Sequence, residues 1–89
     1  MTFLDFSILR IAKVSQGEFA QVANVSRVTV NNWVHARLGV HSARQPRIEK
    51  LLNALHKAVE LKKLPLSDVP HDRRLLSIKQ VVVEVSAAN

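Results

Sequence analysis

The segment Gln16–Trp33, QGEFAQVANVSRVTVNNW, constrains the fold more than any other part of the chain. Two groups of apolar residues in and just after it follow helical spacing: Phe19, Ala20 and Ala23, then Val30, Trp33 and Val34. Between them, Asn24 is a residue type that tolerates the left-handed conformation of a tight corner. Ser26 can cap a following helix, since its hydroxyl accepts a hydrogen bond from a free backbone amide. The pattern predicts a helix-turn-helix, whose second helix can enter the DNA major groove.

The segment resembles the helix-turn-helix of the lambda repressor and Cro group, the xenobiotic-response-element-like transcriptional regulators, over residues 16–33 of 89. Gln16 opens the first helix, Ala20 is the small residue where the helices touch, and Asn24 holds the turn position that is usually glycine in this family. The family's buried sites match Val25, Val30 and Trp33. The resemblance implies an all-α fold, a lambda repressor-like bundle of about five helices, and DNA binding through a recognition helix over residues 27–36.

Four side chains of that helix are expected to face the bases: Arg27, Val28, Asn31 and Asn32. In the family, the first exposed turn and the next one meet the base edges. Arginine bonds guanine bidentately, asparagine does the same with adenine, and an apolar side chain contacts the thymine methyl group. The alternative is a solvated surface helix, but two successive asparagines are weak helix formers and favour a functional role.

Six polar residues are expected to contact backbone phosphates: Gln16, Ser26, Arg37, His41, Ser42 and Arg44. The resemblance implies that the Gln16 amide reaches a phosphate and helps to hold a neighbouring recognition side chain. From Arg27 to Lys57 the chain has six basic residues against Glu49 alone, within a formal net charge of +6. Such a surplus beside a groove-reading helix indicates phosphate binding, although any single residue could be a plain surface charge.

Local signals bound the helix-turn-helix on both sides. Ser15 and Glu18 form a capping-box pattern before its first helix. Gly39 is expected to end the recognition helix. Trp33 shares a face with Val30, so we predict that it lies in the core and does not stack on a base.

Apolar spacing predicts further helices on either side of this unit. A first helix is expected over Phe3–Val14, and a fourth from Arg47 to about Lys63, because Pro46 is tolerated in a first turn. The tail, residues 71–85, fits a helix or a strand. Its β-branched run favours a strand, but the longer helical period favours a helix.

The apolar stripe of the tail consists of Leu75, Ile78, Val82 and Val85. It is longer than the core of a small domain needs, so we predict that these residues form a homodimer interface. The helix-turn-helix DNA-binding domain is then expected over residues 1–64, and residues 65–89 are expected to form a dimerisation element of the same domain.

The composition argues against several other classes of protein. The absence of cysteine excludes disulfides and thiolate zinc sites, and the four histidines lack the spacing of a helical zinc site. No catalytic constellation is apparent, so we expect no metal, no cofactor, no small-molecule substrate and no enzyme activity. No apolar run approaches the roughly 20 residues of a membrane span, and the N-terminus lacks signal-peptide features. These features predict a cytoplasmic protein, in a bacterium or a phage-infected host.

Together these observations predict a sequence-specific transcriptional regulator, most like a phage or prophage repressor, that binds double-stranded DNA as a homodimer. One helix in one groove touches too few base pairs for selectivity, whereas twofold symmetry sets two recognition helices about 34–36 Å apart on a palindromic operator. Two alternatives stay open. One is an antitoxin that represses its own operon, and the other is a helix-turn-helix fold used as a protein-binding module.

Overall fold

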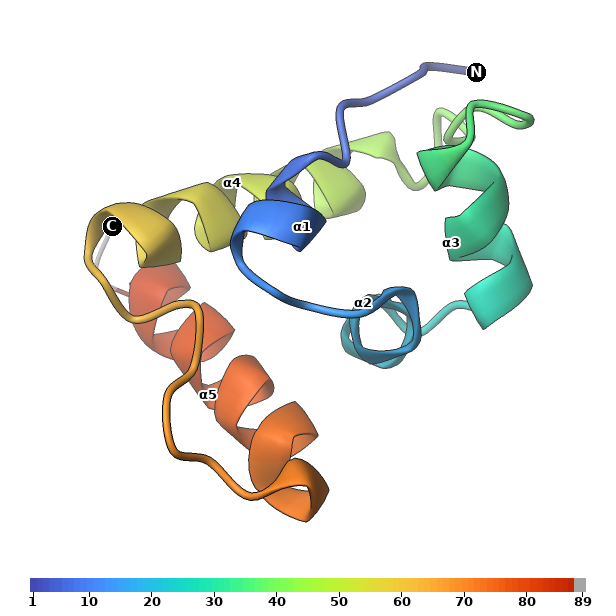
Figure 1. Ribbon diagram of the computed structural model, residues 1–89. Coiled ribbons are helices and arrows are strands. Elements are labelled where there is room, and N and C mark those ends of the chain that lie inside the picture. Colours follow the sequence, from blue (N-terminus) through green and yellow to red (C-terminus); the bar gives the residue numbers. More distant parts are fainter. Residues whose placement is uncertain (88–89) are drawn as a thin grey trace.

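Five α-helices and one 3-10 helix make up the regular structure of the computed structural model, which describes residues 1–87 (Figure 1). In chain order they are α1 (Ile8–Ile11), α2 (Gln16–Ala23), α3 (Arg27–Val34), α4 (Gln45–Glu60), the 3-10 helix η1 (His71–Arg73) and α5 (Arg74–Ala87). Within these residues the only β-type pairing is an isolated antiparallel bridge between Thr2 and Val40. The prediction of an all-α chain is confirmed.

All five α-helices contribute to one apolar core. Its largest fully buried side chains are Phe19, Ile8, Ile48, Leu55, Ile78, Val30, Val40 and Val85. The Trp33 ring stacks on Phe6 with ring centroids 5.9 Å apart, and Phe6 meets Phe19 edge-on at 6.0 Å. The prediction that Trp33 belongs to the core is confirmed. This aromatic group ties α2 and α3 to the segment that precedes α1, which fixes the corner against the rest of the molecule.

The first helix is much shorter than the predicted span Phe3–Val14. Phe3, expected on its apolar face, is 65% exposed. The Asp5 carboxylate accepts a hydrogen bond from the backbone amide of Ser7 at 2.9 Å, and a local turn of this kind competes with helix. Upstream, Thr2 exchanges two backbone hydrogen bonds with Val40, at 2.7 and 3.0 Å. Residues 1–6 therefore form an extended N-terminal arm that reaches the loop after α3 (Figure 1).

The recognition helix also ends earlier than predicted, at Val34 instead of Ala36. Ala36 itself takes the left-handed conformation after the helix, with φ of 54°. Ala36 therefore has the helix-ending role expected of Gly39. Gly39 is needed for a different reason. A Cβ atom there would lie 3.0 Å from Met1 Cβ and 3.2 Å from the Thr2 backbone nitrogen, which is too close for ordinary packing. Glycine at this position lets the N-terminal arm lie directly against the loop.

The fourth helix agrees with the prediction to within a few residues, and Pro46 lies in its first turn as expected. The tail is a helix, α5, which settles the choice between helix and strand in favour of the longer period. The linker after α4 turns the chain back, so that α5 packs against both α4 and α2. The helical reading of the tail is confirmed.

The prediction that the apolar stripe of the tail exceeds the core is wrong. Ile78, Val82 and Val85 are buried in the core of their own chain, and Leu75 is half-buried. The physical reason is that α4 and α2 together offer α5 an apolar surface large enough to cover these side chains. Three of the four residues predicted as a dimer interface are therefore buried within one chain, and Leu75 is partly covered.

Candidate nucleic-acid interface

The corner between α2 and α3 is built by three local devices. At the start of α2, the Ser15 hydroxyl accepts from the Glu18 amide at 3.0 Å, and the Glu18 carboxylate accepts from the Ser15 amide at 2.9 Å. This reciprocal capping box is as predicted. α2 ends at Asn24 in the left-handed conformation, with φ of 58°. Ser26 then caps α3 by accepting from the Thr29 amide at 3.1 Å. The expected roles of Asn24 and Ser26 in the turn are confirmed.

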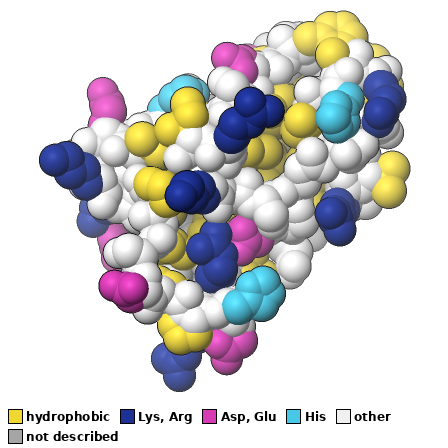
Figure 2. Space-filling view, viewed as in Figure 1, with side chains coloured by type: hydrophobic (Ala, Val, Ile, Leu, Met, Phe, Trp, Pro, Cys, Tyr) yellow, Lys and Arg dark blue, Asp and Glu magenta, His cyan; other side chains and the backbone are white. Residues whose placement is uncertain are grey.

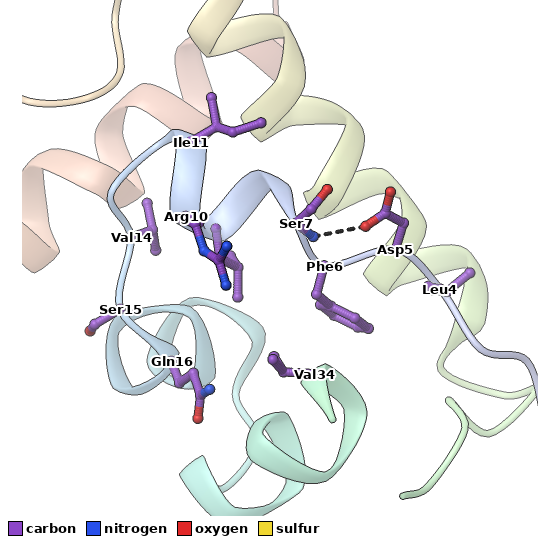
Figure 3. A pocket seen from close by; sticks show the side chains of 11 residues that line it. Leu4, Asp5, Phe6, Ser7, Arg10, Ile11, Val14, Ser15, Gln16 and Val34 are labelled. Atoms are coloured by element: carbon purple, nitrogen blue, oxygen red, sulfur yellow. Dashed lines mark hydrogen bonds between the residues drawn. The ribbon is translucent and has the colours of Figure 1, made fainter. Parts of the chain in front are cut away.

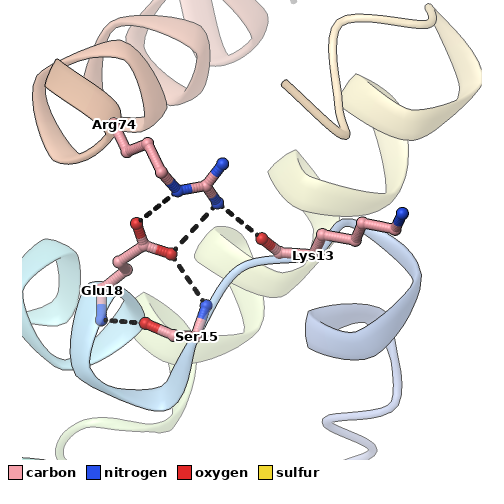
Figure 4. A network of polar contacts seen from close by, with 4 residues as sticks. All are labelled: Lys13, Ser15, Glu18 and Arg74. Carbon is pink, nitrogen blue, oxygen red and sulfur yellow. Dashed lines mark hydrogen bonds and ion pairs between the residues drawn. The ribbon is translucent and has the colours of Figure 1, made fainter. Parts of the chain in front are cut away.

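Two arginines from distant parts of the chain hold α2 at its ends. Arg47, in the first turn of α4, donates a hydrogen bond to the Ala23 carbonyl at the end of α2. Arg74, at the start of α5, donates to the Glu18 carboxylate at 3.0 Å and to the Lys13 carbonyl at 2.7 Å (Figure 4). Sequence reasoning counted Arg47 in the basic surplus that indicates phosphate binding, and it missed Arg74. Fifty-six residues separate Arg74 from Glu18, and no local pattern links them.

The charge of Glu18 is stabilised by this contact. Partial burial raises the pKa of the Glu18 carboxyl, but the hydrogen bonds from Arg74 and from the Ser15 amide, with the positive charge of Arg74, outweigh that effect. The pKa of Glu18 therefore lies below its ordinary value of 4.5. The ion pair is mostly shielded from solvent, with exposed side-chain fractions of 24% for Arg74 and 17% for Glu18. Such a pair is screened less by salt than a surface pair.

The outer side of α3 carries the four side chains predicted to face bases. Arg27 and Val28, in the first turn, are exposed, and Val28 is 69% exposed despite being apolar. Asn31 and Asn32, one turn further on, are half-buried. Val30 and Trp33 point into the core, as predicted. The helix thus offers one cation, one apolar side chain and two amides on the side away from the core.

One of these amides, Asn31, is engaged within the protein. Its Nδ2 donates to Gln16 Oε1 at 2.9 Å, and its Oδ1 accepts from an amino nitrogen of Arg37, also at 2.9 Å. Asn32 forms no side-chain hydrogen bond within residues 1–87, in contrast to its neighbour. Asn31 is therefore less free to meet a base than the sequence suggested, and it joins two residues predicted to contact phosphates.

The loop between α3 and α4 exposes His41, Ser42 and Arg44, as expected of phosphate contacts. The N-terminal arm fixes this loop from one side, because the Thr2 hydroxyl also donates to Gln45 Oε1 at 2.7 Å. The Nδ1 atom of His41 accepts from the Ala43 amide at 3.1 Å, so the proton of the neutral ring lies on Nε2 and can be donated outward. The loop is thus fixed by these hydrogen bonds, and the side chains of His41, Ser42 and Arg44 are exposed to solvent.

Positive charge dominates this part of the molecule. Between Glu18 and Glu49 the chain contains no acidic residue, and it contains four arginines there, at positions 27, 37, 44 and 47. In Figure 2, the edge that carries α3 and its following loop shows basic and His side chains and no Asp or Glu on the visible face. An acceptor-only ligand such as a phosphate chain would meet donors and cations across this surface.

A hollow beside Gln16 adds a cation that sequence reasoning did not assign to the site. It encloses about 710 Å³ between the N-terminal arm, α1, the start of α2 and the end of α3 (Figure 3). Its walls are mainly apolar, and Arg10 and Gln16 both line it. Arg10 lies in α1 and Gln16 is the first residue of α2, so it is the fold that brings these two side chains to the same hollow.

Within residues 1–87, no group of three or more His, Cys, Asp or Glu side chains could hold a metal ion. Across the same part of the chain, no helix combines the length and the apolar character that crossing a membrane would require. No protein-family model matches the sequence, and neither a curated protein nor a solved structure gives a significant match.

Proposed function

We propose that this protein is a non-enzymatic, sequence-specific DNA-binding regulator with a lambda repressor-like fold that acts in the cytoplasm. The observation that carries the proposal is the α2–α3 corner. It joins two helices through a left-handed Asn24 and leaves Arg27 and Val28 exposed at the start of the second. The first turn of a recognition helix is the part that meets base edges in the major groove.

Base reading is assigned to three of these exposed or half-exposed side chains on α3. Arg27 suits the O6 and N7 atoms of guanine, Asn32 suits the N6 and N7 atoms of adenine, and Val28 suits the thymine methyl group. The free side-chain amide of Asn32 and the exposure of Val28 support these roles. Each correct bidentate contact is worth about 1–3 kcal/mol against the wrong base.

Phosphate contacts are assigned to both sides of α3. Gln16 lies at the start of α2 and Arg10 lies in α1 beside the same hollow, while Arg37, His41 and Arg44 lie in or beside the loop after α3. Ser42 belongs to the same loop, and Ser26 already uses its hydroxyl to cap α3. The absence of acidic residues from 19 to 48 supports the assignment of Arg37, His41 and Arg44, since a carboxylate there would repel the DNA backbone.

The regulator is proposed to act as a homodimer, with the dimer contact on the outer face of α5. Leu76 and Val83 are 71% and 66% exposed and lie seven residues apart, so they share one side of the helix, opposite the buried Ile78. These two exposed apolar side chains on one face of α5 support this placement of the contact. Repression would follow from occupancy, because a dimer bound near a promoter blocks polymerase.

Selection of bound duplexes from a random library tests the proposal directly. A palindromic selected sequence is the expected result, with half-sites about one helical turn apart. If about ten phosphates are neutralised per dimer, log affinity falls against log salt concentration with a slope near −9. Arg44→Ala removes one phosphate contact from each subunit, so it is expected to flatten that slope by about two and to weaken all duplexes alike.

Failure to retain any duplex, even at low salt, would contradict DNA binding. That result would favour the use of the same basic face by an acidic protein partner.

A further inference from the structure

The geometry points to Asn31 as a positioning residue that orients two phosphate-binding groups, Gln16 and Arg37, and does not itself read a base. Its side-chain amide bonds both of them, at 2.9 Å each. The inference rests on the proposed DNA binding, and it revises the role expected of Asn31 from its place on the recognition helix.

The hydrogen bond to Gln16 selects one of two orientations of the Gln16 amide. Asn31 Nδ2 is a donor, so the atom of Gln16 that faces it is the acceptor, Oε1. The other end of the Gln16 amide, the Nε2 amino group, is then directed away from Asn31. A phosphate only accepts hydrogen bonds, so it needs this donor end. Asn31 thereby holds Gln16 in the orientation that suits a phosphate.

The hydrogen bond to Arg37 uses the opposite end of the same amide. Asn31 Oδ1 accepts one of the five donors of the guanidinium group and leaves the others for a ligand. Because asparagine is neutral, Arg37 keeps its full charge while its side chain is held in place. An aspartate at this position would neutralise that charge and would turn the Gln16 amide round, since a carboxylate has no donor to offer.

The contrast with Asn32 supports this division of roles. The two asparagines are adjacent and both half-buried, yet only Asn31 spends a donor and an acceptor on protein partners among the described residues 1–87. A bidentate contact with adenine requires one donor and one acceptor of the same amide. Asn32 has its whole amide available, whereas Asn31 already uses one of its two donors and one of its two acceptor lone pairs, and these bonds fix the orientation of its amide within the protein.

The test compares Asn31→Ala with the matched neighbour Asn32→Ala on the selected duplex and on duplexes with single base-pair changes. Loss of two hydrogen bonds that position charged or polar groups is expected to weaken binding about 5- to 30-fold. For Asn31→Ala this factor should be equal on all duplexes. Asn32→Ala should instead relax the preference at one base pair. A base-specific loss for Asn31→Ala would overturn the inference.

A double-mutant cycle gives a readout that a loss of folding would not produce. In a Gln16→Ala background, Asn31→Ala is expected to lose part of its effect on affinity, because one of the groups that it positions is gone. Full additivity with both Gln16→Ala and Arg37→Ala would also overturn the inference. Asn31→Asp keeps the shape of the side chain, and it is expected to bind all duplexes more weakly than Asn31→Ala does.

A measurement on the unbound protein separates this inference from the proposed function. The side-chain amide protons of Asn31 are expected to exchange slowly with solvent, and Gln16→Ala should speed that exchange. If no duplex is selected, the proposed function fails. If duplexes are selected but Asn31 exchange is insensitive to Gln16→Ala, only the role assigned to Asn31 fails.

Discussion

Replacing Ile78 by alanine tests whether α5 belongs to the core of one chain. The Ile78 side chain is 0% exposed, so the change removes three buried carbon groups. At about 0.8 kcal/mol for each, their transfer to water costs about 2.4 kcal/mol, and the cavity left behind adds to that. We expect a loss of about 3 kcal/mol in the free energy of unfolding. A domain of this size has about 5–13 kcal/mol in total.

Urea denaturation followed by circular dichroism measures this loss. The loss is expected to be the same at two protein concentrations that differ about a hundredfold, because the contact is made within one chain. Leu76→Ala is the matched control. It lies two residues away on the exposed side of α5, so we expect it to change the stability of the monomer by less than about 0.5 kcal/mol.

The opposite pattern would refute the burial of α5 as described. If Ile78→Ala left a dilute sample as stable as the wild type and only weakened self-association, Ile78 would lie between chains. Sedimentation of the same two variants completes the comparison. Leu76→Ala should sediment more slowly than the wild type if the outer face of α5 joins two copies. If this variant still sediments as a dimer, the dimer contact lies elsewhere.

Three further predictions concern the corner and its supports. Glu18→Gln keeps the capping box but loses the ion pair, so it should lower stability at pH 7 by about 1–2 kcal/mol in thermal unfolding. Since the pKa of Glu18 is lowered by folding, the wild type should lose this advantage as pH falls below about 4.5, and a constant difference down to pH 2 would contradict the assignment. Ala36→Gly relieves a left-handed alanine and should raise stability by up to about 1 kcal/mol, and a lower melting temperature would show that Ala36 is not strained. Gly39→Ala must displace the N-terminal arm, so proteolysis of residues 1–6 should become faster, and unchanged proteolysis would argue against the close approach.

Local signals in the sequence predicted the corner well. The Ser15–Glu18 capping box, the left-handed Asn24 and the Ser26 cap all depend on neighbours within a few residues. Helical spacing likewise identified Trp33 as a core residue. These features are visible in sequence because the groups that interact lie within one or two helical turns of each other.

Contacts between distant segments could not be predicted in this way. The apolar residues of the tail have the same spacing whether they meet α4 of their own chain or a second copy, so periodicity alone could not assign them. The first helix is short partly because Thr2 pairs with Val40, and no local sequence pattern predicts this pairing. The engagement of Asn31 depends on Gln16, fifteen residues earlier and on another helix.

The N-terminal arm also has a practical consequence for anyone who works with the protein. Met1 packs against Gly39, beside His41, so any peptide fused ahead of Met1 emerges at the loop proposed to grip the DNA backbone. An affinity tag or fluorophore attached there would collide with the duplex and lower the measured affinity for DNA. Labels are better attached away from this loop.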